Sequence, residues 1–389
     1  MNLSDVEIMN ENINWIFFAA QAKPSSMRRA VAERLAEKER VVIVEQPVSL
    51  VRDRTFMPLS ERCLPFGKEG NSWYYRPLHF PEKLLGMGRI FRVLNEKLIQ
   101  REIDRLLPPQ KDRIICYDSP TQYPLVKKFR ERLSVYLAID DRTRTVWGNS
   151  IPGELEAERK ILEKVDQVIC VSEPLAQTLK IRGSQGQTPP IFVLPNGYDE
   201  RIFDPSVDYP EPRFLKNVTR PRILIAGHVS ERIDWDGIAA GSLLRPDWTW
   251  IFLGPTDPGM EEKVRCLLDS RALLHPSVPL DSVPAWMQHC DVCAVPYRLN
   301  EFTEASNPLK AIEYLAMGRP ILSTKIPSLN PYGEVIELVQ EGRGDSYASA
   351  LDIFLSDGRN GSRKQERCNA VRCAAWKIKA EQFRRVILS

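Results

Sequence analysis

Histidine is scarce in this sequence. Among its 389 residues there are only four histidines, His79, His228, His275 and His289, so no Ser-His-Asp arrangement can be proposed. The glycine-rich fingerprint GxGxxG and the P-loop with its lysine are both absent. Dehydrogenase and NTPase interpretations therefore lack their phosphate-binding loops.

Long apolar runs and a strong charge of one sign are missing as well. The apolar stretch at residues 13–20 is far shorter than the roughly 20 residues of a membrane helix. No basic residue precedes Lys23 to begin a secretory signal. A net charge of +3 argues against a dedicated nucleic-acid binder, which is usually strongly basic. We therefore expect a cytoplasmic protein without nucleic acid as a partner.

The eight cysteines are spread along the chain rather than grouped. Cys116, Cys170 and Cys293 lie in apolar runs, where a free cysteine packs as a small hydrophobic residue. Cys290 and Cys293 form a CxxC pair, but neither a second pair nor a histidine at zinc-ligand spacing accompanies it. We expect reduced cysteines packed in the core and no metal.

Short apolar runs alternate with helix-length segments, which is typical of βαβ units and a doubly wound parallel sheet. The expected strands lie at residues 15–20, 41–45, 73–75, 114–117, 135–139, 167–171, 191–194, 222–226, 250–253, 291–295 and 321–324. The expected helices lie at residues 81–107, 124–132, 154–165, 261–270, 283–289 and 308–317. A proline-rich stretch at residues 204–221 is interpreted as a linker. It divides the chain into α/β domains at residues 1–205 and 206–375, with a ligand expected in the cleft between them.

The segment at residues 306–320 carries the clearest chemical signal. Ser306 or Asn307 can cap a helix with Pro308 in its first position. Lys310 is anomalous in a first turn, where free N–H groups favour an acid, unless an anion is bound there. Lys310 and the free amides would suit a diphosphate, and Glu313 could accept hydrogen bonds from ribose hydroxyls. A solvated surface lysine and glutamate are the alternative.

This segment resembles the donor-binding segment of GT-B glycosyltransferases of the family-4 type. The matching stretches are residues 166–175, 193–199, 203–205 and 307–321. Residues 227–234 and 246–254 resemble the subgroup found in cell-surface polysaccharide biosynthesis. The resemblance implies two doubly wound Rossmann-like domains that face each other across a cleft. It also implies a C-terminal helix at residues 376–389 that packs back on the N-terminal domain.

The function implied by the resemblance is a retaining transfer of a sugar from a nucleotide diphosphate sugar, without metal or other cofactor. Lys310, Arg232 and the amides of residues 307–309 would stabilise the leaving diphosphate. Glu313 matches the ribose-binding glutamate. The remaining donor-side candidates are Gly227, His228, Gly254, Ser306, Asn307, Pro308 and Leu309.

Two positions depart from the family pattern. Ala305, with Glu304 adjacent, stands where the family has a second glutamate that contacts the donor sugar. His228 stands where an arginine of the phosphate-binding pair is usual, and Arg232 falls near the lysine position. Arg232 could instead form an ion pair with Glu231 or Asp234.

Further candidates lie on the acceptor side of the cleft. Asp140 and Asp141, at the end of a strand, could orient the acceptor hydroxyl or the donor sugar, or could form a strand-end turn. Gln21, in the loop after the first strand, is a candidate acceptor contact. Asp234 and Asp236 spell D-x-D, but both suit the first turn of a helix better than a metal site.

The expected acceptor is a glycan or polyprenyl-linked sugar. Residues 83–132 hold twelve basic and six acidic residues, a local charge of +6 that could meet an anionic membrane on its inner face, or form a solvated helix face. Two other functions fit the same fold: a GT-B protein that binds without transferring, motivated by Ala305 and His228, and a nucleotide-sugar epimerase.

Overall fold

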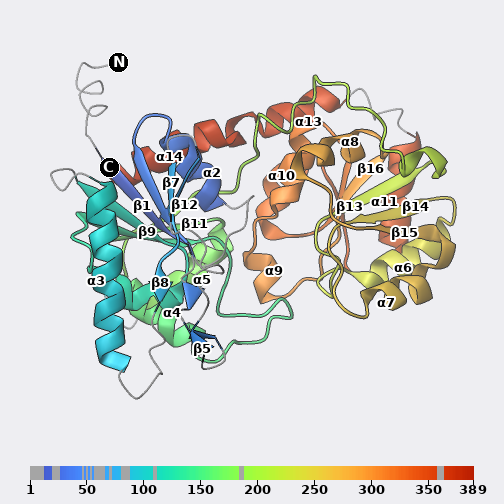
Figure 1. Ribbon diagram of the computed structural model, residues 1–389. Coiled ribbons are helices and arrows are strands. Elements are labelled where there is room, and N and C mark those ends of the chain that lie inside the picture. Colours follow the sequence, from blue (N-terminus) through green and yellow to red (C-terminus); the bar gives the residue numbers. More distant parts are fainter. Residues whose placement is uncertain are drawn as a thin grey trace.

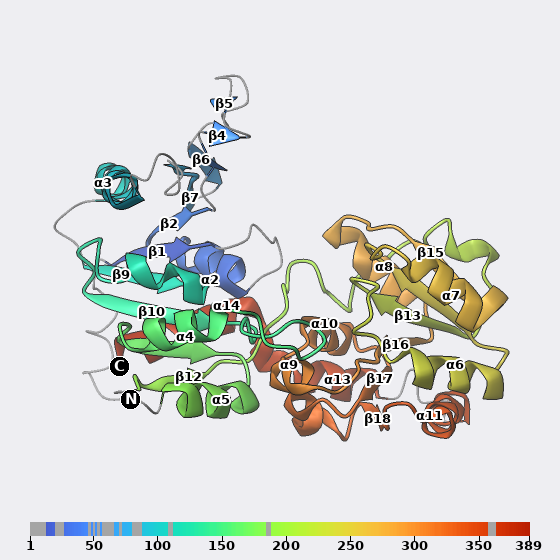
Figure 2. The same cartoon turned by 90° about the horizontal axis from the view of Figure 1, so that it is seen from below.

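The chain folds into two α/β domains that lie side by side (Figures 1 and 2). The computed structural model describes residues 13–19, 27–45, 48–49, 51–52, 55–56, 66–69, 72–79, 88–107, 112–183, 188–356 and 363–389. Gln21 and the first residues of the helix expected from residue 81 lie outside these ranges.

The N-terminal domain is built on an eight-stranded sheet of order β12-β11-β10-β9-β1-β2-β7-β6, parallel except for β6. Its strands are β1 (Asn14–Phe18), β2 (Arg40–Val44), β6 (Phe66–Glu69), β7 (Ser72–Tyr75), β9 (Arg113–Tyr117), β10 (Leu133–Ala138), β11 (Gln167–Cys170) and β12 (Ile191–Val193). The helices are α2 (Met27–Leu35), α3 (Gly88–Leu106), α4 (Glu154–Leu162) and α5 (Glu173–Gly183). Every residue of β1 is buried, because helices cover both faces of a parallel sheet. Short strands β3 (Val48–Ser49), β4 (Val51–Arg52), β5 (Thr55–Phe56) and β8 (Leu78–His79) form two small separate sheets.

The C-terminal domain repeats this architecture with a six-stranded parallel sheet of order β15-β14-β13-β16-β17-β18. Its strands are β13 (Arg222–Ala226), β14 (Thr249–Leu253), β15 (Ala272–His275), β16 (Val292–Val295), β17 (Ile321–Thr324) and β18 (Glu337–Val339). Its helices are α6 (Trp235–Leu244), α7 (Met260–Leu268), α8 (Val283–Gln288), α9 (Glu301–Ala305), α10 (Leu309–Ala316), α11 (Gly344–Ser356) and α13 (Lys364–Ala370). Cys290 and Cys293 are free and buried in this core, as expected, and burial raises the pKa of Cys293 to about 12.

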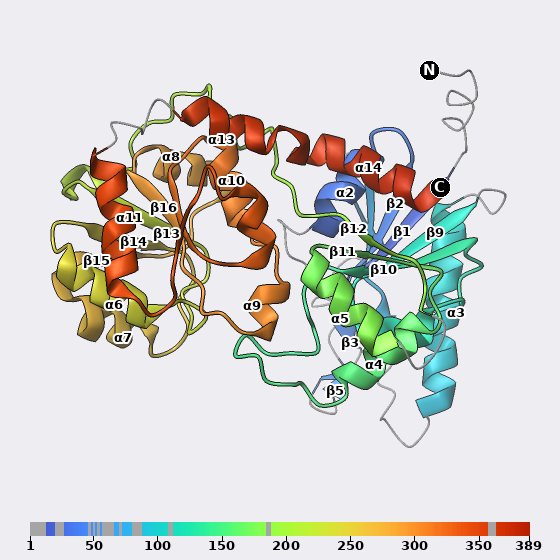
Figure 3. The ribbon, with the colours of Figure 1, turned by 180° about the vertical axis from the view of Figure 1, so that it is seen from behind.

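The last helix, α14 (Trp376–Leu388), leaves the C-terminal domain and packs on the N-terminal one (Figure 3). The Phe383 ring lies 5.9 Å from that of Trp15, and Trp376 also belongs to the N-terminal core. In the other direction, Phe203 is buried in the C-terminal core. The boundary expected at residue 205 lies close to this residue and stays a prediction.

The prediction of a helix at residues 124–132 is wrong. The structure has a 3-10 helix, η4 (Pro120–Leu125), followed by turns in which Lys127 and Arg130 adopt left-handed φ values of 65° and 57°. The carboxylate of Glu131 accepts hydrogen bonds from the N–H groups of Lys127 and Phe129, which fixes these turns. A local side-chain bond of this kind competes with helix formation.

Candidate functional site

Two glycines at the ends of neighbouring strands let a lysine approach the backbone. Gly227 follows β13 with φ 122°, and Gly254 follows β14 with φ 148°. A Cβ on Gly227 would lie 2.7 Å from Cε of Lys310, and one on Gly254 would lie 2.7 Å from the Gly227 carbonyl carbon. Only glycine fits at both positions, and the absence of a Cβ at Gly227 leaves room for the Lys310 side chain.

Tyr297, just after β16, contacts two cationic side chains of the site. The guanidinium carbon of Arg232 lies 4.3 Å from the centre of the Tyr297 ring, and Nζ of Lys310 lies 5.5 Å from it. Arg232 also donates a 3.2 Å hydrogen bond from Nη2 to the Tyr297 hydroxyl. Burial raises the pKa of Tyr297, but the positive charges of Lys310 and Arg232 outweigh it and lower that pKa below its ordinary value.

Lys310 itself carries the strongest indication of a ligand. Its Nζ atom is buried and faces Tyr297, whose pKa it lowers, but no carboxylate of the described residues forms an ion pair with it. An ammonium withdrawn from water without a partner is costly. The site therefore favours an anion that completes the coordination of Lys310.

The start of α10 differs from the expected capping. Pro308 occupies the N-cap position, and no side chain caps the helix. The Asn307 side chain instead accepts a 2.8 Å bond from the Asn196 N–H, while its carbonyl accepts a 2.7 Å bond from the Asn196 side chain. Ser306 Oγ donates to the Thr303 carbonyl at 2.6 Å. The first amides of α10 are thus left uncapped, which suits an anion.

Glu313 lies one turn along α10 and is partly buried. Desolvation raises its pKa to about 7 against the opposing charge of Lys310. Its carboxylate receives no hydrogen bond within the part of the chain that the structure describes, so it can accept hydroxyl groups of a ligand.

Neighbouring polar residues have other partners. His228 Nε2 lies 2.6 Å from Asp257 Oδ1. Glu231 pairs with Lys263, so neither Glu231 nor Asp234 forms the ion pair that was the alternative for Arg232. Asp234 caps α6, as expected, and also accepts bonds from the Gly342 N–H and the Tyr347 hydroxyl, both at 2.9 Å.

Ala305 is buried between the domains, where its carbonyl accepts a 2.5 Å bond from Ser172 Oγ. Glu304 beside it is exposed. The position that the resemblance assigns to a donor-sugar contact therefore serves domain docking here.

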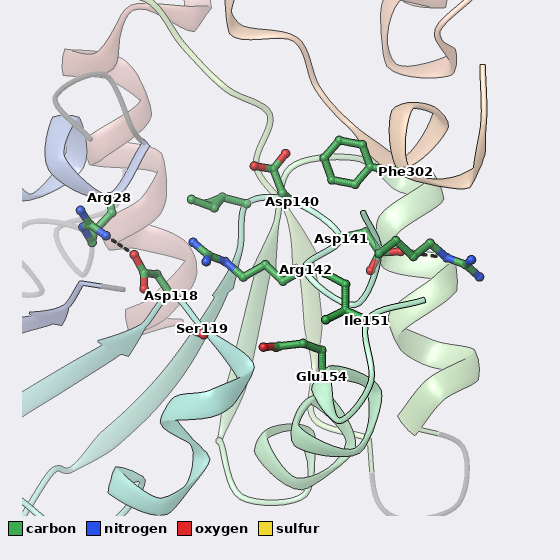
Figure 4. A pocket seen from close by; sticks show the side chains of 11 residues that line it. Arg28, Asp118, Ser119, Asp140, Asp141, Arg142, Ile151, Glu154 and Phe302 are labelled. Atoms are coloured by element: carbon green, nitrogen blue, oxygen red, sulfur yellow. Dashed lines mark hydrogen bonds and ion pairs between the residues drawn. The ribbon is translucent and has the colours of Figure 1, made fainter. Parts of the chain in front are cut away.

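A pocket of about 320 Å³ lies at the carboxyl ends of β9 and β10 (Figure 4). It is lined by Arg28, Asp118, Ser119, Ile139, Asp140, Asp141, Arg142, Arg144, Ile151, Glu154 and Phe302. Phe302 belongs to α9 of the C-terminal domain and the others to the N-terminal domain, so the pocket lies at the boundary of the two domains. Arg144 pairs with Glu301, and Asn300 Nδ2 donates to the Val146 carbonyl at 3.1 Å, which joins the pocket loop to α9.

The two adjacent aspartates of this pocket have different roles. Asp140 is exposed, and its negative charge acts to raise the pKa of Tyr297. Asp141 is 1% exposed and is held by Arg182 at 2.8 and 2.9 Å and by Thr143 Oγ1 at 2.7 Å. Although burial opposes it, these bonds lower the pKa of Asp141. These bonds favour the alternative that Asp141 forms a strand-end turn, and a role of Asp141 in the cleft stays a prediction.

The structure brings Gly227, Gly254, Arg232, Lys310 and Glu313 together in the C-terminal domain, while Asp140 lines the pocket of the N-terminal domain. Sequence reasoning missed Tyr297, because an aromatic residue after a buried strand looks like core. It also missed Arg142 and Glu154. A signal existed for these two, since both flank the strand-to-helix loop that begins with Asp140.

Two facing Rossmann-like domains with a returning last helix are the GT-B fold, and solved GT-B structures match nearly the whole chain. Residues 220–357 match the family described as Glycosyl transferases group 1. The chain therefore has the GT-B fold, and part of its C-terminal half is similar to group 1 glycosyltransferases.

A protein provisionally named teichuronic acid biosynthesis glycosyltransferase TuaH, from Bacillus subtilis (strain 168), is 26% identical over 228 residues, which cover 57% of this chain and 56% of that one. The chain thus spans just over half the length of this curated relative. Sucrose-phosphate synthase from Thermosynechococcus elongatus has a TM-score of 0.71 at 17% identity, over 97% of this chain and 98% of that one. A Burkholderia xenovorans α,α-trehalose-phosphate synthase (UDP-forming), in complex with glucose-6-phosphate, has a TM-score of 0.68 at 11% identity, over 97% of this chain and all of that one.

Proposed function

We propose that the protein is a retaining glycosyltransferase that moves a sugar from a nucleotide diphosphate sugar to a glycan or lipid-linked acceptor, without a metal. The buried ammonium of Lys310, which has no ion pair with a carboxylate among the described residues, carries this proposal. It lies against Gly227, beside Arg232 and at the uncapped start of α10, where a diphosphate would find positive charge on three sides.

The chemistry follows from where charge develops. When the bond from the anomeric carbon to the diphosphate breaks, negative charge grows on the leaving phosphate, and Lys310 and Arg232 stabilise it more than they stabilise the ground state. The acceptor hydroxyl attacks the same face, and its proton passes to the departing phosphate oxygen. Glu313 holds the ribose, and Asp140 orients a sugar hydroxyl from across the cleft.

The raised pKa of Glu313 supplies the test of the donor site. As the pH falls from 8 to 6, a carboxylate with a pKa of about 7 becomes protonated and loses its capacity to accept two hydroxyl bonds. Affinity for a nucleotide diphosphate sugar should therefore fall about tenfold over this range. Calorimetric titration with UDP-, GDP-, ADP- and TDP-glucose measures it, since their phosphodiesters do not titrate in this range.

The control is Glu313→Gln, which should bind more weakly at pH 8 and lose the pH dependence. Unchanged pH dependence in this variant would remove Glu313 from the donor site, as would tighter binding at pH 6. The anomeric configuration of any product, read by NMR, tests retention. Nucleotide binding with no product from any acceptor would favour the GT-B protein that binds without transferring.

We further propose that α3 docks on an anionic membrane surface. Ile90, Val93 and Leu94 are 59%, 49% and 37% exposed, and exposed Lys97 and Arg101 continue the same helical face. The opposite face, with Ile99 and Ile103, is buried in the domain. An apolar patch followed by cations suits lipid headgroups.

The wider basic segment does not act as one surface. Arg113 is buried and bonded to Asp104, and Lys127 pairs with Asp166. The N-terminal end of α3 lies on the lower side of the molecule in Figure 1, where β5 and α9 also lie. Within the described ranges, no helix combines the length and apolar character needed to cross a bilayer.

Vesicle co-sedimentation tests the membrane proposal. The double variant Lys97→Glu/Arg101→Glu should lower binding to vesicles containing phosphatidylglycerol by more than about tenfold, because each cation near such a surface contributes about 1 kcal/mol. Leu94→Asn should weaken binding as well. Leu243→Asn, at a leucine of α6 that is 69% exposed and so more accessible than Leu94, is the control and should change nothing. Binding that ignores salt and lipid charge would contradict the proposal.

A further inference from the structure

The pocket of Figure 4 contains cations that are already neutralised by neighbouring acids. Arg28 and Asp118 pair with each other, and their side chains are only 4% and 0% exposed. Arg144 is shared between Asp141 and Glu301. Neither of these two groups offers an unmatched positive charge to a ligand.

Two other groups of the pocket do remain available. No hydrogen bond or ion pair from a described residue reaches the Arg142 guanidinium. Oε2 of Glu154, at the start of α4, is buried without a partner. Figure 4 shows both side chains extending into the pocket toward the wall formed by Asp118 and Ser119. A donor on the partly exposed Arg142 and a buried, unsatisfied acceptor on Glu154 thus face one space.

The chemistry of these groups selects a neutral polyol. A hydroxyl can accept from Arg142 and donate to Glu154, so adjacent hydroxyls of one sugar ring satisfy both groups. Phe302 adds an apolar surface from the other domain. At about 320 Å³ the pocket is at the small end of ligand sites, which span about 300–1,000 Å³, and this suits one or two sugar units.

The charges of the lining argue against an anionic ligand. Four carboxylates (Asp118, Asp140, Asp141 and Glu154) face three guanidinium groups (Arg28, Arg142 and Arg144). A phosphate or carboxylate placed here would gain one available cation and meet Glu154 and Asp140 as like charges. Like charges brought together in such a site cost several kcal/mol.

We propose that this pocket binds the end of the acceptor as an uncharged saccharide, held by Arg142 and Glu154, and that it discriminates against phosphorylated and uronic sugars. The proposal rests on the proposed function, because the saccharide is the acceptor of that reaction. It separates this chain from the trehalose-phosphate synthase above, whose structure is a complex with glucose-6-phosphate.

Saturation-transfer NMR on the full chain, with and without UDP, tests it. The probes are the methyl glycosides of glucose, galactose, mannose and N-acetylglucosamine, against glucose 6-phosphate and methyl glucuronide. At least one neutral glycoside should bind more than tenfold tighter than either anion. Arg142→Met should weaken that binding about tenfold, since a hydrogen bond from a charged donor is lost.

Two further variants sharpen the test. Glu154→Gln keeps an acceptor but removes the charge, so it should retain the neutral glycoside and bind glucose 6-phosphate more tightly than the wild type does. Arg265→Met, an exposed arginine of α7, is the matched control and should change nothing. Thermal melting of each variant shows that a loss of binding is not a loss of folding.

The outcomes separate the two proposals. UDP titration in the same samples measures binding at the donor site. Absence of UDP binding would reject the proposed function, whereas the glycoside data test the pocket independently. Binding of glucose 6-phosphate as tight as that of the neutral glycosides would overturn the inference. So would a neutral panel in which nothing binds, or an Arg142→Met variant that binds as the wild type does.

Discussion

Replacing Lys310 by methionine should lower kcat of sugar transfer by about 100- to 1,000-fold, the usual loss when one preorganised charge contact to a transition state is removed. In the proposed reaction the ammonium lies where the leaving diphosphate gains negative charge, and no carboxylate of the described residues forms an ion pair with it. Methionine keeps the volume over Gly227, so the effect reports charge rather than a cavity. Steady-state and single-turnover kinetics measure the loss.

The stability of this variant should move in the opposite direction. A buried ammonium without a carboxylate to pair with destabilises the apo protein, so Lys310→Met should melt at the same temperature or higher. Lys216→Met, an exposed lysine of the same domain, should leave both kcat and melting unchanged. A Lys310→Met enzyme that transfers at the wild-type rate would remove Lys310 from the reaction. A lower melting temperature would show instead that the lysine serves the fold.

The strands were predictable because a strand covered on both faces must be apolar throughout. β1, β9, β13 and β16 satisfy this rule and were expected within a residue or two. β15 and β18 are edge strands with partly exposed residues, and their mixed composition gives no such signal.

The candidate site was predictable only where local chemistry was unusual. A lysine in the first turn of a helix is an anomaly that the sequence displays, and Lys310 was found in that way. The bonds of Asp141 could not be predicted, because they depend on Arg182, which is 41 residues away in sequence and reaches it through α5. Asn307 was assigned to the donor, but its side chain is bonded to Asn196, 111 residues away. Contacts between residues so far apart in sequence depend on how the domains pack, and they produce no periodic pattern in the sequence.

Arg182→Met should be the most destabilising of the substitutions considered, with a loss of about 3–5 kcal/mol in the free energy of unfolding. Arg182 bridges Asp141 and Glu158, two carboxylates that are each 1% exposed, at 2.7 to 2.9 Å. Without the guanidinium both remain buried and close together. Denaturant unfolding measures the loss, and the loop that carries Asp140 and Arg142 should become more mobile with it.

The pH dependence and a double-mutant cycle identify the cause. Desolvation already raises the pKa of Glu158 despite Arg182, so removing the arginine raises it further. Protonation then relieves the buried charge, and the difference between wild type and Arg182→Met should shrink as the pH falls from 8 to 5. Glu158→Gln in the Arg182→Met background should recover part of the stability, because it deletes one of the two unpaired charges. Additive losses in this cycle, or a deficit that grows toward acid pH, would show that the arginine contributes through packing rather than charge.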